Sequence, residues 1–246
     1  MSFNVLKIVL IALLGTALAT AAAAREVSLL TVDWDPYYGS SLDNGGPVME
    51  MTREAFKRAG HTITVHYVPW KRAVYTVANG EADVVVGAYY SDERTEKFIF
   101  TNPYWGIDVG FVALESFPLD TYDSLHDLET YQIGVNRGWA NSEEFDAADY
   151  LSKEEATHQI LNIRKLFAER VDLIVLAHGI FNYEYSRMKD EFTKPTKFLK
   201  PPLASNQLHN MVSRQIDDGE QLVDDFNRGL QEIKEDGTYD EIFRRH

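Results

Sequence analysis

The sequence contains no cysteine, which excludes disulfide bonds, thiolate metal sites, a cysteine nucleophile and a lipid anchor on an N-terminal cysteine. Basic residues are also scarce. There are 24 Lys and Arg against 38 Asp and Glu, and the net charge of −14 makes nucleic acid a poor partner. The 7 histidines show no paired spacing that would hold a metal, so we expect neither a metal site nor a cofactor.

Only one long apolar run is present, and it lies at the N-terminus. Residues 1–24 carry a single charge, at Lys7, followed by an apolar stretch and three alanines before Arg25. This pattern is typical of a secretory signal peptide, with cleavage expected after Ala24. An uncleaved membrane anchor is the alternative, which the short apolar core disfavours. No later run approaches the length of a membrane span, so residues 25–246 are expected to be soluble and exported.

The exported part alternates strand and helix patterns. In the first half we expect a strand, a helix, a strand, a helix and a buried strand, at residues 27–32, 47–59, 62–68, 72–79 and 82–87. In the second half we expect strands at 108–114, 131–135, 171–176 and 208–213, and helices at 154–169 and 222–233. Such alternation is typical of an α/β protein with a mostly parallel sheet.

One segment carries most of the functional information. It runs from Gly80 to Tyr104 and reads GEADVVVGAYYSDERTEKFIFTNPY. Its strand is apolar on both faces, and ligands of open α/β sheets collect beyond the carboxyl ends of such strands. Tyr89 and Arg94 follow there, and an arginine offers a planar fork of donors that suits a carboxylate. A surface arginine paired with neighbouring acids is the alternative.

The same segment resembles the core signature of the family 3 bacterial extracellular solute-binding proteins, typified by the polar amino-acid receptors of ABC importers. Further motifs are similar to those of the family and occur in its order. They are DWDPYY at 33–38, LHDLETYQIGV at 125–135 and FNRGLQEIKEDGTYDEIF at 226–243. The resemblance covers nearly the whole exported chain.

The resemblance implies an α/β, two-lobed periplasmic-binding-protein-like fold of type II, with a hinge between the lobes. The lobes would comprise residues 25–107, residues 108–209 and a C-terminal return to the first lobe at 210–246, after the signal peptide at 1–24. The ligand would lie in the cleft between the lobes, and hinge closure would bury it. Without the resemblance, the residues indicate only an α/β protein with a possible division near residues 105–110.

The resemblance also implies roles for residues of the first lobe. In the family, the arginine of the Glu-Arg motif binds the α-carboxylate of the ligand, and Arg94 occupies that position. The family places an aromatic wall and a backbone donor at the positions of Trp34 and Tyr89, and Trp70 is a further aromatic candidate. Aromatic residues at strand ends otherwise serve in packing.

The second lobe offers candidates at two strand ends. Arg137 and Trp139 lie in a loop that enters a helix, whose free N–H groups suit an anion. After the strand at 171–176, many members place an aspartate that pairs with the α-ammonium of the ligand. The aligned residue here is Ala177, followed by His178, which as a lone histidine has packing as its alternative role. Without that carboxylate, a buried ammonium would need another partner, or the ligand would lack the ammonium altogether; the candidate partners are an aromatic face, Glu143 and Glu144. The missing aspartate and the added cations favour a small organic anion or a modified amino acid.

The leading hypothesis is a monomeric periplasmic protein that captures a small carboxylate-bearing solute and delivers it to an ABC permease in the inner membrane. It is expected to have no enzymatic activity, because no nucleophile motif, metal set or phosphate loop is present. Two alternatives from other classes stay open. One is a ligand-sensing adaptor for a membrane receptor, and the other is an enzyme on the solute-binding fold, such as a dehydratase.

Overall fold

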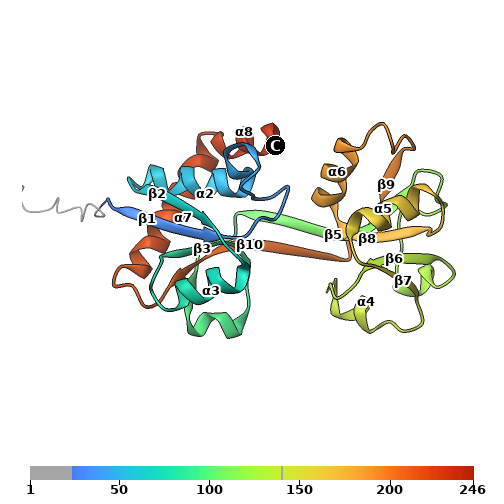
Figure 1. Cartoon of the computed structure of the whole chain (residues 1–246), viewed down its shortest axis with the longest axis horizontal. Coiled ribbons are helices and arrows are strands. Elements are labelled where there is room, and N and C mark those ends of the chain that lie inside the picture. Colours follow the sequence, from blue (N-terminus) through green and yellow to red (C-terminus); the bar gives the residue numbers. More distant parts are fainter. Residues whose placement is uncertain (1–23, 140) are drawn as a thin grey trace, which may run out of the picture.

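The computed structural model describes residues 24–139 and 141–246, which form two lobes joined by two long strands (Figure 1). The architecture is α/β, as the residue pattern predicted, and two-lobed, as the family resemblance implied. The expected signal peptide lies outside the described residues except for Ala24, so its cleavage stays a prediction. Within the described ranges, no helix combines the length and the apolar character needed to cross a membrane.

The first lobe begins with three parallel strands. β1 (Glu26–Thr31) pairs with β2 (Thr62–Tyr67) on one side and with β3 (Val84–Tyr89) on the other. The crossover helices are α2 (Pro47–Arg58) and α3 (Trp70–Ala78). A proline can open α2 because the first N–H of a helix has no intrahelical partner. The carboxyl ends of β1 and β3 therefore point together toward the second lobe (Figure 1).

Two strands cross between the lobes side by side. They are β5 (Trp105–Leu114) and β10 (Ala204–Ser213), and they pair antiparallel from Trp105 opposite Leu208 to Val109 opposite Ala204. β10 continues into the first lobe beside β3, and β5 continues into the second lobe. A single sheet in the order β2-β1-β3-β10-β5-β8-β6-β7 thus runs through both lobes.

The second lobe repeats the parallel arrangement. β6 (Gln132–Asn136) pairs in parallel with both β7 (Ser152–Ala156) and β8 (Leu173–Ala177), and β8 also pairs antiparallel with β5. The remaining elements of this lobe are α4 (Glu143–Ala147), α5 (Gln159–Phe167), α6 (His178–Arg187) and β9 (Thr196–Phe198). Their connections place the starts of α4 and α6 next to the first lobe (Figure 1).

The expectation of one helix over residues 154–169 is wrong in its first third. Residues Ser152–Ala156 form β7, and the helix α5 begins only at Gln159. Glu154 and Glu155 are good helix formers, but their backbone pairs in register with Gly134 and Val135 of β6. Pairing in the sheet overrides the local propensity, and charged residues are common on such an edge strand.

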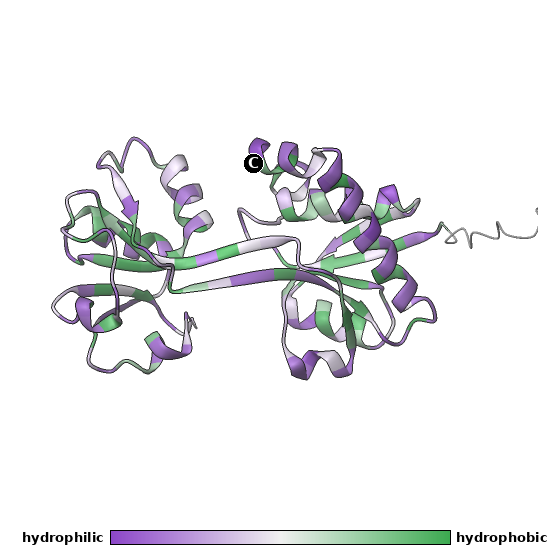
Figure 2. Cartoon of the chain, turned by 180° about the vertical axis from the view of Figure 1, so that it is seen from behind, coloured by the Kyte–Doolittle hydropathy of each residue, from purple (hydrophilic) through white to green (hydrophobic). Residues whose placement is uncertain are grey.

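The C-terminal helices return to the first lobe. α7 (Gly219–Glu235) packs on α2, and the two backbones approach so closely that a Cβ on Gly229 would lie 1.9 Å from the carbonyl oxygen of Ala55. α8 (Thr238–Arg245) follows it. Apolar residues line the strands and the inner helix faces, whereas the outer helix faces are hydrophilic (Figure 2). The short elements are β4 (Phe98–Phe100), η1 (Asp43–Gly45), η2 (Asp92–Glu96) and η3 (Leu125–Leu128).

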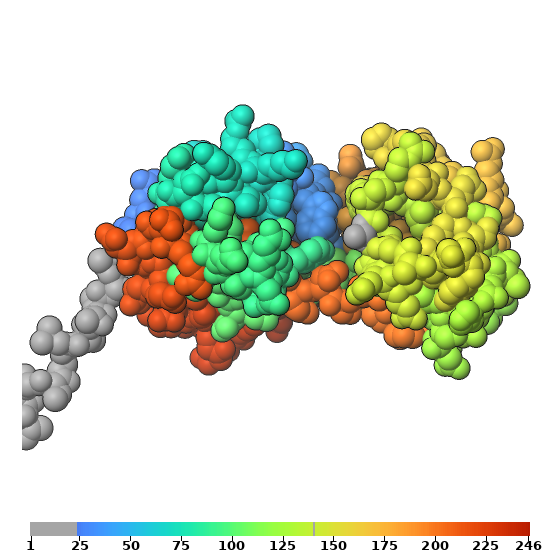
Figure 3. Space-filling model, turned by 90° about the horizontal axis from the view of Figure 1, so that it is seen from below, coloured from blue at the N-terminus to red at the C-terminus, as the bar shows by residue number. Residues whose placement is uncertain are grey.

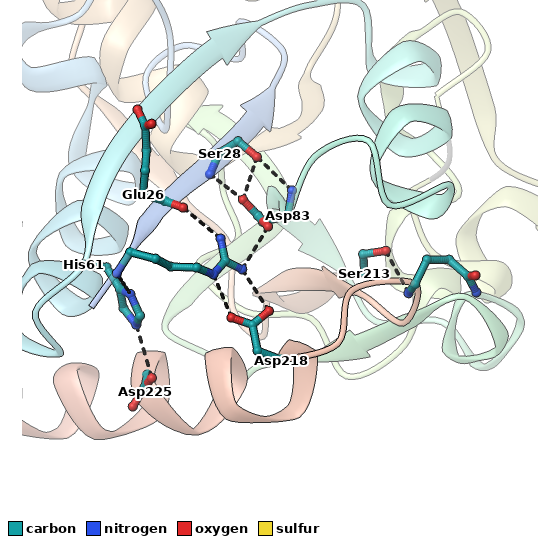
Figure 4. A network of polar contacts seen from close by, with 9 residues as sticks. Glu26, Ser28, His61, Asp83, Ser213, Asp218 and Asp225 are labelled. Atoms are coloured by element: carbon teal, nitrogen blue, oxygen red, sulfur yellow. Dashed lines mark hydrogen bonds and ion pairs between the residues drawn. The ribbon is translucent and has the colours of Figure 1, made fainter. Parts of the chain in front are cut away.

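A polar network holds the start of β1 in the first lobe (Figure 4). The guanidinium of Arg25 donates to Asp218 at 2.7 Å and to Asp83 at 2.9 Å, and Asp83 also accepts from the backbone N–H and hydroxyl of Ser28. Beside it, the buried imidazole of His61 lies 3.2 Å from Asp225 of α7. The network ties β1 to β3 and α7. The residue limits proposed for the two lobes remain a prediction.

Candidate functional site

A cleft of about 250 Å³ lies between the two lobes. It forms where the carboxyl ends of β1 and β3 face the loops that follow β6 and β8. The space-filling view from below shows the two lobes meeting there over the crossing strands (Figure 3). The residues that line it are Trp34, Tyr89, Val109, Trp139, Asn141, Leu176, Ala177, Ile180 and Asn206.

Trp34 and Tyr89 form the wall contributed by the first lobe. Their rings meet edge to face, with centroids 6.1 Å apart and planes at 83°. A tight turn holds Trp34, because its backbone N–H donates to the carbonyl of Tyr38 at 2.7 Å. The hydroxyl of Tyr38 in turn donates to Gly87 of β3 at 2.9 Å, which joins the loop to the neighbouring strand. Burial raises the pKa of Tyr89 to about 12, because the partly enclosed ring disfavours the charged phenolate.

Arg94 lies beside this wall, in η2. Its Nη1 donates to the carbonyl oxygen of Tyr89 at 2.8 Å, and its guanidinium lies over the ring of Trp70, 5.9 Å from the centroid. Neither Arg94 nor Trp70 lines the cleft itself. One hydrogen bond and one ring face hold the guanidinium, which has five N–H donors in total.

Trp139, Asn141 and Ala177 belong to the wall of the second lobe. Trp139 is 47% exposed and follows β6, whereas Ala177 ends β8. Asn141 is fixed by Asp146, which accepts hydrogen bonds from its backbone N–H at 2.9 Å and from its side-chain amide at 3.1 Å. Ser142 caps α4 by accepting from the N–H of Phe145.

The structure does not bring Arg137 and His178 to the lining of the cleft. The Nε of Arg137 pairs with Glu155 at 2.9 Å, and its side chain is 63% exposed. His178 stacks on Phe198, with centroids 4.0 Å apart, and its Nε2 is enclosed without a hydrogen-bond partner among the described residues. Burial lowers the pKa of His178, and the charge of Asp108 opposes that shift only in part. The ligand roles of both residues stay predictions.

Tyr37 lies between this cleft and a second cavity of about 440 Å³. Its ring is 4.9 Å from that of Trp34, and it also lines the second cavity, which opens between α6 and α8. Burial raises the pKa of Tyr37, while the backbone N–H groups of Gly179 and Ile180 lower it. We place the ligand in the smaller cleft because the carboxyl ends of the parallel strands converge there.

Sequence reasoning missed the part of the wall formed by the crossing strands. Val109 of β5 and Asn206 of β10 line the cleft, although both lie within strands rather than at strand ends. The pairing of Trp105 with Leu208 and of Val109 with Ala204 sets which side chains of these strands face the cleft. No local motif marks that pairing, although alternation along β5 would place Val109 and Trp105 on one face.

The fold and the interlobe cleft define the class of a two-lobed solute-binding protein. The chain belongs to the bacterial extracellular solute-binding proteins, family 3, whose model matches residues 32–246. It is 23% identical to a probable histidine-binding protein of Neisseria gonorrhoeae over 217 residues, which cover 84% of this chain and 77% of that protein. It is 22% identical to an arginine-binding periplasmic protein of Mannheimia haemolytica over 246 residues, 97% of each chain.

Among solved structures, the fold is similar to that of the L-cystine solute receptor of Neisseria gonorrhoeae in its unliganded open conformation. The TM-score is 0.75 at 17% sequence identity, with 92% of this chain and 93% of that chain covered. The family and these relatives are named for binding rather than for catalysis, which confirms the prediction of a solute-binding protein and not an enzyme.

Proposed function

We propose that this protein captures an amino acid, or a closely related small solute that bears a carboxylate, in the interlobe cleft and delivers it to the permease of an ABC importer. The observation that carries the proposal is the position of Trp34 and Tyr89 opposite Trp139, with one lobe on each side of a solute-sized cleft. Two relatives are named as a probable histidine-binding protein and an arginine-binding protein, and these names support an amino-acid class of ligand.

Arg94 is the proposed anchor for the carboxylate. It lies at the cleft edge in η2, and its hydrogen bond to Tyr89 together with its contact to Trp70 holds the guanidinium near the aromatic wall. A small rotation of the side chain would present the remaining N–H groups to a carboxylate as a two-pronged donor. Binding across both lobes would favour a closed form, because only that form brings all contacts to the solute.

The two strands that connect the lobes also support the proposed delivery of the solute to a permease. The lobes are linked through β5 and β10, so a change in these strands turns one lobe relative to the other. The closed form would be the one that a permease in the inner membrane recognises. This role requires export, and we propose that the protein works in the periplasm as a monomer after cleavage behind Ala24.

A thermal-shift screen of the purified, ligand-stripped protein tests the proposal. The panel contains the common amino acids, small carboxylates, polyamines and sugars, and it is run in parallel on Arg94→Ala and Arg170→Ala. Arg170 is an exposed arginine before β8, at the end of the strand away from the cleft. A ligand at about a hundred times its Kd should add roughly 2.7 kcal/mol of stability.

We expect a carboxylate-bearing solute to stabilise the parent protein and Arg170→Ala alike, and to stabilise Arg94→Ala far less. A hit that survives in Arg94→Ala unchanged would remove Arg94 as the anchor. A hit confined to polyamines or sugars would overturn the proposed class of solute.

A further inference from the structure

Among the described residues that line the cleft, three are aromatic and none is charged. Trp34, Tyr89 and Trp139 line it, and the other described lining residues are either apolar or asparagines. Trp34 and Tyr89 stand nearly perpendicular, so together they form an aromatic corner with two ring faces. Trp139, which is 47% exposed, supplies a third ring from the opposite lobe.

The acidic residues near this corner are turned away or engaged. Asp108 lies next to Val109 on β5, so its side chain points to the opposite strand face, where it accepts a hydrogen bond from Ser205 at 2.6 Å. Asp33 accepts from the backbone N–H of Ser40 at 2.5 Å. Because β8 ends in Ala177, that strand end supplies no carboxylate to the lining either.

Asp35 is the other acidic residue in the DWDPYY loop after β1, which also holds Asp33 and Trp34. One of its carboxylate oxygens accepts from the hydroxyl of Tyr183 at 3.3 Å, and the other is enclosed beside Gly39 with no partner among the described residues. Neither oxygen lines the cleft. Glu143 and Glu144, at the start of α4, are also not among the described residues that line the cleft, so a cation there would meet ring faces rather than a carboxylate.

We infer that the cleft is built for a solute whose ammonium group is methylated, so that the ligand is a small betaine-type carboxylate rather than an ordinary α-amino acid. This rests on the proposed function, with Arg94 receiving the carboxylate. A primary ammonium carries a positive charge and three N–H donors, and burying it without a carboxylate partner is unfavourable even where neutral acceptors are present. A trimethylammonium group has no N–H donor, and its positive charge is well matched by aromatic faces.

The two asparagines fit this assignment. The side-chain amide of Asn141 already donates to Asp146, which leaves its carbonyl as a neutral acceptor at the cleft. Asn206 of β10 adds a second neutral amide. Neutral amides do not replace the charge of the missing aspartate, so the aromatic rings must supply the attraction for the cation.

Isothermal titration calorimetry on the whole purified protein compares matched pairs of probes. Each pair consists of an amino carboxylate and its fully N-methylated counterpart: glycine with trimethylglycine, β-alanine with its trimethyl form, and the secondary amine L-proline with its dimethyl form. We expect the methylated member of at least one pair to bind about ten-fold more tightly than its partner, as cation–π contacts of this kind allow.

Three variants examine the ring that Trp139 supplies opposite the aromatic corner. Trp139→Leu keeps an apolar wall but removes the ring face, and should weaken binding of the methylated probe about 3- to 30-fold. Trp139→Phe keeps a ring face and should stay close to the parent. Tyr150→Leu is the matched control, because Tyr150 is an exposed aromatic residue of the second lobe outside the cleft lining.

Ala177→Asp should reverse the preference. A carboxylate at the end of β8 would pair with a primary ammonium, so the unmethylated probes should gain affinity relative to the methylated ones. Circular dichroism of each variant confirms that it is folded before its affinity is compared.

The outcomes separate the two proposals. If ordinary amino acids bind in an Arg94-dependent way and their methylated counterparts do not, the methylated-ligand inference is wrong and the proposed function stands. If a methylated probe binds equally well to the parent and to Trp139→Leu, the cation is not held between the rings of the two lobes and the inference is also wrong. If no probe of either kind binds, the methylated-ligand inference fails, and the thermal-shift screen with Arg94→Ala decides the proposed function separately.

Discussion

The hydroxyl oxygen of Tyr37 lies 2.8 Å from the point where a Cβ of Gly179 would stand. Tyr37 belongs to the loop after β1 in the first lobe and is only 4% exposed, whereas Gly179 lies in the first turn of α6 in the second lobe. The two lobes therefore touch here, side chain against backbone, without room for one additional methyl group. This contact lies beside the candidate cleft, since Ile180 of the same turn lines it.

Gly179→Ala is expected to disturb the lobe contact. Alanine favours a helix over glycine by about 1 kcal/mol, so α6 alone would gain stability. The clash with Tyr37 should outweigh this gain and lower the free energy of unfolding by about 1–3 kcal/mol, or push the lobes apart. Urea unfolding and the radius of gyration from small-angle scattering measure the two effects.

Two further variants isolate that contact. Tyr37→Leu in the Gly179→Ala background should restore the parent's radius of gyration. Gly106→Ala is the control, because a Cβ there meets only the flexible end of Gln207 at 3.3 Å. If the Gly179→Ala protein is more stable and no more extended than the parent, Tyr37 moves aside at little cost in free energy and the prediction is wrong.

Trp70 is predicted to position Arg94 for the solute. Trp70→Ala removes the ring under the guanidinium and should weaken binding of the carboxylate ligand about 3- to 30-fold, whereas Trp70→Phe should recover most of the affinity. Calorimetry with the solute found in the screen provides the measurement. Tyr75→Ala, on an exposed position of the same helix, should leave the affinity unchanged. Equal losses in Trp70→Phe and Trp70→Ala would argue against a role for the ring face.

His178 should make the stability of the protein sensitive to mild acid. Burial depresses its pKa, so the fold favours the neutral imidazole. The contribution of the neutral imidazole to the free energy of unfolding is fully present above the unfolded-state pKa of about 6.5. It is lost as the pH falls toward the lower folded-state pKa. His178→Phe keeps a flat ring against Phe198 but cannot titrate, so it should lose less stability than the parent between neutral pH and about pH 5.

Urea unfolding at the two pH values checks this difference. His126→Phe serves as the control, because His126 is an exposed histidine in η3 of the same lobe. Should the parent and His178→Phe lose equal stability on acidification, the imidazole would not be the sensitive group.

Asp83 should contribute stability that disappears in stronger acid. Burial by itself would raise the pKa of this carboxyl group, but hydrogen bonds from Arg25 and Ser28 outweigh burial and hold the pKa below its usual value. The contribution of Asp83 to the free energy of unfolding is therefore present above the unfolded-state pKa of about 3.9. It is lost as the pH falls through the folded-state pKa. At neutral pH, Asp83→Asn should reduce the free energy of unfolding by about 1.5–3 kcal/mol.

The difference in stability between the parent and Asp83→Asn should narrow as the pH falls from about 4 through the folded-state pKa of Asp83, below which both side chains are neutral. Asp218→Asn is the comparison, because Asp218 binds the same guanidinium but is 45% exposed, and solvent weakens its pairing. A larger loss in Asp218→Asn than in Asp83→Asn at neutral pH would contradict this ranking.

Much of the fold could be predicted because its signals are local. The three valines of β3, the proline that opens α2 and the apolar face of α7 each act within a few residues, and the structure has these elements near their predicted places. The strand β7 was missed because its glutamates favour a helix, and only the neighbouring β6 makes an extended backbone preferable.

The candidate site could be predicted only in part. The sequence pointed to Trp34, Tyr89 and Trp139 as aromatic residues at strand ends, and all three line the cleft. It also pointed to Arg137 and His178, which lie at equally suitable strand ends. The side chain of Arg137 instead pairs with Glu155 of β7, and that of His178 stacks on Phe198 of β9. The spacing of residues along the sequence does not show that these elements lie next to each other.

Local residue patterns were thus sufficient for the α/β class, the order of most elements and the gathering of aromatic and charged side chains at the carboxyl ends of strands. Which of those side chains meet was decided by tertiary structure alone. Trp139 faces Trp34 and Tyr89 only because β5 and β10 pair in one register and so set how the two lobes are placed. That register depends on contacts between residues about a hundred positions apart, which spacing along the sequence does not specify.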